Sequence, residues 1–318
     1  MAWLLLSPVM AAADPPKVVV SIKPIHALIA GVMAGVGSPD ILISGGASPH
    51  AYALRPSEAR SLSRADLIFW VGESLETFLI KPLKSLGTNA TVIELAGAQG
   101  IKLLKSREGR AWETHDHGDD RDSKTHENDS HHEHEQKSES KPAHGAYDVH
   151  IWLGRDNAKA IVNAAVFALS EKDPSNAQRY RQNGQNVIAR IDSTFRDIGA
   201  RLAAVKHVPY LVFHDAYHYF ERDHRLNAAG SISTHEAQKP GAKRLAEIRA
   251  KLRAHDIRCV FAEPQFEPAL IKTVIGGTRA KPGVLDPLGA NLPAGPDAYF
   301  RLLENLAENL KECLGKTP

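Results

Sequence analysis

The sequence has little of several features that mark large classes of proteins. Its 39 lysine and arginine residues nearly balance its 37 aspartate and glutamate residues, and the formal charge of +2 gives no argument for binding nucleic acid or an anionic membrane surface. It shows no internal repeat, which argues against a solenoid or a propeller. Its apolar run at residues 2–10 is too short to span a bilayer as a permanent anchor.

That apolar run is instead typical of an export signal. Ala11, Ala12 and Ala13 supply the small residues that a signal peptidase accepts, and the segment 14–16 (Asp-Pro-Pro) then breaks any helix. The run is short for a signal peptide and lacks a basic start, so a disordered tail is the alternative. We expect residues 1–13 to be a signal peptide.

Cysteine is scarce as well, with two residues in the whole chain. Cys259 lies in a strand-like run, and Cys313 lies near the end of the last predicted helix. In an oxidising compartment the two can form a disulfide bond. The alternative that the sequence leaves open is a pair of separate buried thiols.

Short apolar runs separated by helical stretches dominate the rest of the chain. Such runs are typical of strands that are buried on both faces of mainly parallel sheets. The predicted strands are residues 18–22, 41–43, 67–71 and 92–93 in the first half, and residues 210–213, 259–261 and 284–285 in the second.

One long amphipathic segment separates the two halves. Apolar residues recur at three- and four-residue spacing between Tyr180 and Val205, after a start signal at residues 173–175 and before Pro209. A helix of about 30 residues would be roughly 45 Å long. We therefore expect an α/β protein with two (β/α) lobes joined by a long backbone helix.

This prediction divides the chain into four parts. They are a signal peptide (1–13), a first lobe (14–174), a connecting helix (175–206) and a second lobe (207–318).

Residues 113–146 interrupt the first lobe and have a different composition. Over residues 113–144, ten acidic residues against four basic ones give a net charge of −6, and Ala143 is the only hydrophobic residue. We expect a disordered insertion, since the segment cannot bury enough apolar surface to offset its ordering entropy. Its seven histidines suit weak, secondary binding of divalent transition metals. They are His115, His117, His126, His131, His132, His134 and His144.

Four further residues lie where a predicted strand meets a loop, or next to such a position: His50, His150, His214 and Asp286. In open α/β sheets, ligands bind beyond the carboxyl ends of the strands, so these side chains are candidates for one shared cleft. Three neutral imidazoles and one carboxylate form a tetrahedral set suited to zinc. The sequence thus predicts a primary zinc site.

Five motifs resemble those of the metal-binding solute receptors of ABC importers, in order along nearly the whole mature chain. They are the segments 48–57 (SPHAYALRPS), 148–153 (DVHIWL), 213–217 (FHDAY), 261–266 (FAEPQF) and 285–289 (LDPLG). The resemblance implies two (β/α) lobes with metal held in the cleft between them.

The resemblance also implies ligand roles for His50, His150 and His214. Some relatives have an acidic residue directly before the first ligand, where this chain has Pro49. The fourth ligand is therefore expected to be Asp286 or a water molecule. Glu263 is a weaker candidate, expected to be structural or to face a partner.

A histidine-rich insertion and a histidine at position 214 resemble the zinc-specific, ZnuA-type branch, since manganese receptors typically have a carboxylate there. Cys259 and Cys313 match a cysteine pair that some zinc receptors bridge. The resemblance implies a periplasmic, monomeric receptor that delivers Zn²⁺ to an ABC permease, with no role for nucleic acid.

Three other functions remain open at this stage. A manganese or iron receptor would favour harder oxygen ligands. A zinc hydrolase would need an open coordination position and a general base, and the sequence contains no His-Glu-x-x-His motif. An adhesin or a structural metal protein is the third. We therefore predict a carrier rather than an enzyme.

Overall fold

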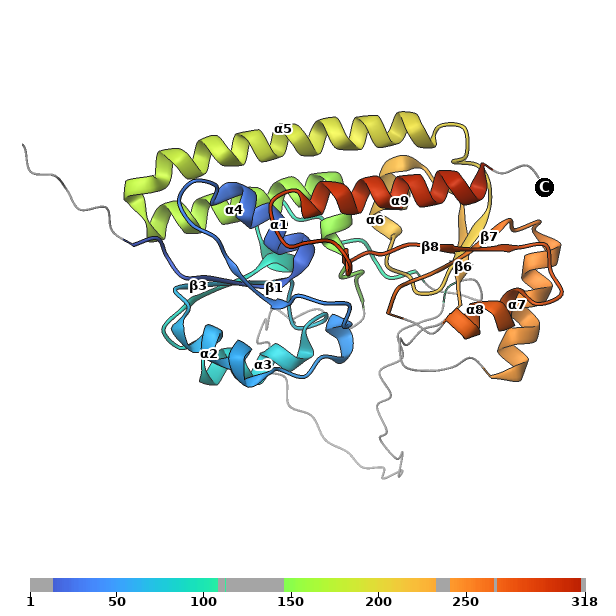
Figure 1. Cartoon of the computed structure of the whole chain (residues 1–318), viewed down its shortest axis with the longest axis horizontal. Helices are drawn as coiled ribbons and strands as arrows, with labels where there is room; N and C mark the ends of the chain where they lie inside the picture. Colours follow the sequence, from blue (N-terminus) through green and yellow to red (C-terminus); the bar gives the residue numbers. More distant parts are fainter. Residues whose placement is uncertain (1–13, 108–111, 113–145, 233–240, 266–267, 316–318) are drawn as a thin grey trace, which may run out of the picture.

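The computed structural model describes residues 14–107, 112, 146–232, 241–265 and 268–315 (Figure 1). Over these residues the chain forms two α/β lobes, each built on a four-stranded parallel sheet. This arrangement confirms the predicted fold class. Among the described helices, none has the length and apolar character needed to cross a membrane.

The first sheet has the strand order β2-β1-β3-β4, so the first strand, β1, lies inside the sheet. Every residue of β1 is buried, as expected for a strand covered on both faces. The strands are β1 (Val18–Ile22), β2 (Asp40–Ile43), β3 (Leu67–Trp70) and β4 (Thr91–Glu94).

The helices of this lobe lie on both sides of its sheet, with α2 and α3 on the lower side in Figure 1. Proline occupies the first turn of α1 and of α2, where its missing N–H costs no hydrogen bond. The α-helices are α1 (Lys23–Val32), α2 (Pro56–Arg64), α3 (Ile80–Ser85) and α4 (Arg155–Lys172). Short 3₁₀ turns are η1 (Pro49–Ala51), η2 (Thr77–Leu79), η3 (Leu95–Gly97) and η4 (Ile151–Leu153).

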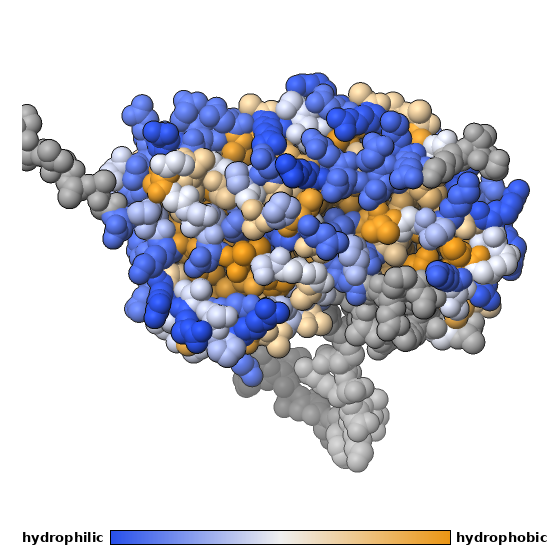
Figure 2. Space-filling model, viewed as in Figure 1, coloured by the Kyte–Doolittle hydropathy of each residue, from blue (hydrophilic) through white to orange (hydrophobic). Residues whose placement is uncertain are grey.

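The long helix is α5 (Ala177–Leu202), which has 26 residues rather than the predicted number of about 30. It follows a 3₁₀ turn, η5 (Pro174–Asn176), and the side chain of Asp173 caps that turn. Gly184 allows α4 to approach closely, because a Cβ atom there would lie 2.4 Å from Cγ2 of Val166. In Figure 1, α5 extends over both lobes, and Figure 2 shows mainly hydrophilic residues along that edge.

The second sheet has the order β6-β5-β7-β8, which repeats the topology of the first. Its strands are β5 (Tyr210–Val212), β6 (Ala228–Ser231), β7 (Cys259–Ala262) and β8 (Lys281–Val284). Strand β6 was absent from the sequence prediction, because Ala-Ala-Gly-Ser lacks the β-branched and aromatic residues that mark strands. Strand β8 begins three residues before the predicted run 284–285 and ends at Val284. It lies at an edge of the sheet, where its Pro282 is tolerated.

The helices of the second lobe are α6 (His218–His224), α7 (Ala242–Ala254), α8 (Pro268–Ile275) and α9 (Ala298–Leu314). Helix α9 contacts α1 and α5 as well as β8, so the chain returns to the first lobe before it ends. A disulfide bond between Cys259 and Cys313 then ties the end of α9 to the start of β7. The predicted bridge is thereby confirmed.

Alternate residues of the second sheet belong to two separate cores. Tyr210, Val212 and Phe261 join a large cluster that also contains the first sheet and the helices packed on it. Leu211 and Val260 face the other way, into a small cluster beneath α7 and α8. This alternation is the period of two that a strand imposes on its side chains.

Candidate metal centre

Three histidines, His50, His150 and His214, come together where the two lobes meet. One nitrogen atom from each ring lies within 4.8 Å of the other two. The ring centroids are 5.6 Å apart for His50 and each of the others, and 4.9 Å apart for His150 and His214. His150 and His214 are each 4% exposed, so two of the three rings are almost fully withdrawn from water.

His50 lies in η1, a single 3₁₀ turn that follows β2 in the first lobe. The hydroxyl of Ser48 accepts a hydrogen bond of 3.2 Å from the His50 backbone N–H, and Pro49 begins the turn. Serine caps such turns because its short side chain reaches the backbone of the residues that follow it. The Ser-Pro-His sequence therefore fixes the backbone that carries this ring.

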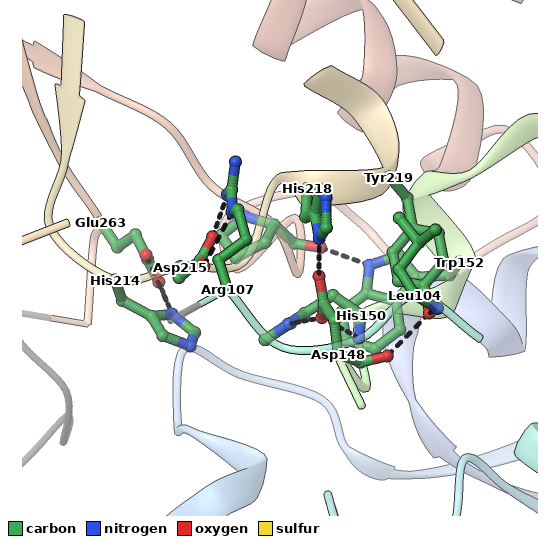
Figure 3. A network of polar contacts seen from close by, with 11 residues as sticks. Leu104, Arg107, Asp148, His150, Trp152, His214, Asp215, His218, Tyr219 and Glu263 are labelled. Carbon is green, nitrogen blue, oxygen red and sulfur yellow. Dashed lines mark hydrogen bonds and ion pairs between the residues drawn. The ribbon is translucent and has the colours of Figure 1, made fainter. Parts of the chain in front are cut away.

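His150 lies just before η4 and is held by Asp148, two residues earlier. Oδ1 of Asp148 lies 2.7 Å from Nδ1 of the ring and accepts a hydrogen bond of 2.9 Å from the backbone N–H of His150. Full burial and the nearby Asp215 together raise the pKa of the Asp148 carboxyl to about 7, although the backbone N–H of His150 acts against both. With Nδ1 directed at the carboxylate, Nε2 is the nitrogen left for a metal (Figure 3).

His214 follows β5 in the second lobe and contacts Glu263, which follows β7. The Nδ1 atom of His214 lies 3.2 Å from Oε1 of Glu263. The register explains the pairing, because Val212 and Phe261 are partners in the parallel ladder and each contact residue lies two positions further on. The arrangement again directs Nε2 away from the carboxylate.

Asp286 does not join the three histidines, although it follows β8 as the sequence prediction required. Its carboxylate accepts hydrogen bonds from the backbone N–H groups of Leu288, Gly289 and Ala290, at 3.0, 2.9 and 2.6 Å. It thus stabilises the turn that it begins. A carboxylate has about four acceptor positions, so these contacts leave room for one more ligand.

Other histidines have different surroundings. His224 is buried and stacks on Phe195, with ring centroids 5.4 Å apart, so it is a packing residue. Nδ1 of His218 lies 3.9 Å from Oδ2 of Asp148, on the far side of that carboxylate from His150. His235 and the seven histidines of the insertion lie outside the described residues.

Sequence reasoning overlooked two groups that support the ligands. Asp148 was quoted as part of a motif but given no role, although its position two residues before a candidate ligand was a usable signal. Arg107 lies 108 residues before its partner Asp215. Nothing local in the sequence indicates that contact.

The donor set fits zinc. Zinc binds imidazole nitrogen at 2.0–2.1 Å in tetrahedral sites, and metal-bound histidines usually donate their second N–H to a carboxylate or carbonyl. Two of the three rings have such a carboxylate. Two α/β lobes with parallel sheets and, among the residues that the structure describes, a cluster of three histidines able to hold a metal are typical of a two-lobed metal-binding receptor.

Comparison with known proteins agrees with that class. Residues 18–313 match the family model described as zinc-uptake complex component A, periplasmic. The chain is 44% identical over 312 residues to the high-affinity zinc uptake system protein ZnuA of Brucella suis, covering 96% of this chain and 93% of that protein. It is 36% identical over 305 residues to ZnuA of Yersinia pestis, covering 93% and 91%.

Solved structures show the same fold. A crystal structure of ZnuA superposes with a TM-score of 0.76 at 24% identity, covering 95% of this chain and 100% of that one. Zinc-bound AdcA from Streptococcus pneumoniae gives 0.70 at 20% identity, covering 95% of this chain and 58% of that one. With the family model and these relatives together, the chain belongs to the ZnuA family of periplasmic zinc-uptake components.

Proposed function

We propose that this chain is a periplasmic receptor that binds Zn²⁺ through His50, His150 and His214 and delivers it to an ABC permease. The convergence of three imidazole nitrogens within 4.8 Å of one another, from both lobes, carries the proposal. The relatives named as high-affinity zinc uptake proteins support it. Binding would favour the closed arrangement of the lobes, because only that arrangement offers ligands from both.

We propose Asp286 as the fourth ligand, with a water molecule as the alternative. Three backbone N–H groups of its own turn hold this carboxylate. It would therefore reach the metal by a movement of the whole turn. A zinc-bound crystal structure tests this assignment. A carboxylate oxygen at about 2.0–2.2 Å from zinc supports it, and a water molecule in that position contradicts it.

We propose binding rather than catalysis. A zinc hydrolase needs a general base that faces a metal-bound water. Here the nearest carboxylates, Asp148 and Glu263, each contact the outer nitrogen of a ligand ring. Their geometry serves to orient ligands. We further propose that the receptor acts as a monomer and has no nucleic-acid partner.

The direct experiment measures metal affinity by competition with a chelator. His50→Ala, His150→Ala and His214→Ala should each weaken zinc binding by at least about 100-fold, since each removes one of few ligands. His207→Ala is the matched control, because His207 is exposed and outside the cluster. Unchanged affinity in all three variants would falsify the site.

A second experiment addresses the choice of metal. We measure the metal content of protein purified without added metal, and then let zinc and manganese compete for the emptied site. A site with three imidazole ligands should retain zinc, since manganese prefers hard oxygen ligands. Preferential retention of manganese would favour the rival receptor function.

The histidine-rich insertion is proposed to add weaker zinc sites. Its imidazoles must lose conformational entropy each time they gather around a metal, so their sites should be weaker than a preorganised one. Deleting residues 114–144 should lower the total zinc stoichiometry in calorimetry and leave one tight equivalent. Loss of the tight equivalent would show that the insertion supplies primary ligands.

A further inference from the structure

One arginine lies at the centre of a cluster of acidic side chains beside the metal centre (Figure 3). The guanidinium of Arg107 forms a two-pronged contact with Asp215, with Nε 3.0 Å from Oδ2 and Nη2 bonded to Oδ1. Its Nη1 donates a hydrogen bond of 2.7 Å to Glu221. The ring of Trp112 covers its face, 3.4 Å from the guanidinium carbon. Each of the three guanidinium nitrogen atoms therefore contacts a carboxylate.

The partners of Arg107 span the chain segment that carries His214. Asp215 is the next residue after that ligand, and Glu221 lies on α6, the helix that follows. Glu221 also accepts a hydrogen bond of 3.0 Å from the hydroxyl of Tyr210, which begins β5. Arg107 therefore connects the strand before the ligand, the turn after it and the helix beyond.

Arg107 follows directly on residues 104–106, which form backbone hydrogen bonds with the segment that carries His150. Ser106 donates a backbone hydrogen bond to Ala146, and Asp148 donates one to Leu104. Asp148 in turn orients His150. Of the two segments that form this backbone pairing, one leads into Arg107 and the other leads into His150.

This geometry ties His214, the histidine that the second lobe supplies, to His150 of the first lobe. Side chains of Arg107, Asp215 and Glu221 are 16%, 17% and 4% exposed, so water screens their attraction only weakly. A bidentate arginine–carboxylate pair fixes orientation as well as distance, which a single-point lysine contact does not.

We propose that Arg107 is a positioning residue for the metal centre: by holding Asp215 and Glu221 it sets the place of His214 relative to His150. This inference rests on the proposed zinc site and extends it to a residue that touches no metal. Without these contacts the turn that carries His214 can adopt other positions. Part of the free energy of zinc binding is then used to bring His214 back, and the affinity falls.

The test uses the full chain and two mild substitutions, Arg107→Lys and Asp215→Asn. The first keeps the positive charge and removes the fork, and the second removes one half of the clamp. We expect each to bind zinc at least about tenfold more weakly in chelator competition, the size of effect seen for groups that orient ligands. Cobalt(II) serves as a spectroscopic probe, and its visible absorption bands should shift because the ligand geometry changes.

Arg190→Lys is the matched control. Arg190 also bonds an aspartate, Asp297, and also lies over an aromatic ring, Phe300, at 3.8 Å. It connects α5 to the start of α9 and has no contact with the ligand segments. Its substitution should leave zinc affinity and the cobalt spectrum unchanged.

The outcomes separate this inference from the proposed site. If His214→Ala weakens zinc binding while both clamp variants bind zinc and cobalt as the unaltered protein does, the site stands and the inference is wrong. If His214→Ala has no effect, the proposed site itself is wrong. A larger loss of zinc affinity in the clamp variants than in Arg190→Lys, together with a shift of the cobalt absorption bands, supports the inference.

Discussion

The two lobes share one topology but are stabilised differently. In the first lobe, both faces of the sheet belong to the large core, as neighbouring residues such as Val18, Val19 and Val20 show. In the second, one face joins that core and the other covers a separate cluster, to which ten buried residues of the described part of the chain belong. The outer layer of the second lobe therefore has less apolar burial to stabilise it, and we expect it to open locally at lower free energy.

The three histidines that we propose as ligands are distributed in the same unequal way. The better-packed lobe supplies His50 and His150, and the second lobe supplies His214 alone among the three. A buried lysine and the arginine clamp connect the second lobe to the first, and a disulfide bond ties its sheet to α9, which packs on α1 and α5. We infer that specific polar and covalent contacts, together with the face of the sheet that joins the large core, hold His214 in place. The first two predictions below each remove one of these contacts.

The largest effect should come from the disulfide bond between Cys259 and Cys313. The bond closes a loop of 54 residues. In the chain-entropy model its loss costs about 4 kcal/mol of the free energy of unfolding. Denaturant unfolding of the oxidised and the reduced protein measures the difference. The double variant Cys259→Ser/Cys313→Ser is the control, because reductant should not change its stability.

A loss of less than about 1 kcal/mol of unfolding free energy on reduction would contradict the view that the second lobe depends on this bond. It would mean that packing of α9 alone holds the second sheet. Proteolysis of the reduced protein sharpens the test, since the first new cleavage sites should appear in the second lobe.

Lys23 should give the next largest effect. Its ammonium group donates hydrogen bonds of 2.9, 2.8 and 2.9 Å to the carbonyl oxygens of Gly289, Ala290 and Leu292. Burial lowers the pKa of Lys23, and nearby Asp286 acts against that shift. Lys23→Met would leave three carbonyls without this donor and should lower the free energy of unfolding by about 3 kcal/mol.

The control is Lys102→Met. Lys102 forms an exposed ion pair of 3.3 Å with Asp156, and such pairs contribute at most about 1 kcal/mol. Equal losses in the two variants, measured by denaturant unfolding, would show that the carbonyl cage of Lys23 has no special role.

Much of this architecture could be predicted from the sequence, and the exceptions share a cause. Strand β1 was predicted with its observed bounds because buried parallel strands are continuous apolar runs. Strand β6 was missed because its residues are small, and it forms through pairing with β5 rather than through propensity. Long-range pairing is not visible in local composition.

The site follows the same rule. His50, His150 and His214 were identified from strand ends and motifs, which are local features. The contact of Glu263 with His214 depends on the register of β5 against β7, and the contacts of Arg107 depend on the whole fold. Three hydrogen bonds from its own turn hold Asp286, and no motif could show that.

The two supporting carboxylates allow a direct comparison of the lobes. Asp148 contacts His150 at 2.7 Å and also binds its backbone, whereas Glu263 contacts His214 at 3.2 Å. Removing a carboxylate that orients a metal ligand typically costs 10–100-fold in affinity, or about 1.4–2.7 kcal/mol. We expect Asp148→Asn near the upper end and Glu263→Gln near the lower end, in chelator competition.

The reverse order would contradict our account of the lobes. It would mean that the second-lobe ligand, having fewer neighbours to fix it, depends more on its single carboxylate. Both variants must first show unchanged unfolding free energies, so that the affinity difference reports on ligand orientation.

The last prediction concerns stability in acid. His224 ends α6, packs against Phe195 and Phe220, and burial lowers its pKa to about 4. In the unfolded chain a histidine titrates near its ordinary value of about 6.5. The unfolded state therefore binds more protons than the folded state between these values. Stability from this group is complete above about pH 6.5 and is lost as the pH falls toward 4.

At pH 5 the loss from His224 should be about 2 kcal/mol relative to pH 7.5, from the difference between the two pKa values. His224→Phe keeps an aromatic ring against Phe195 and cannot titrate. The difference in unfolding free energy between pH 7.5 and pH 5 should therefore shrink by about that amount in the variant. Chelator is present throughout, so that metal release from the three ligands does not contribute. An unchanged pH dependence would show that α6 opens to water before the protein unfolds, and the helix after His214 would then belong to the labile part of the second lobe.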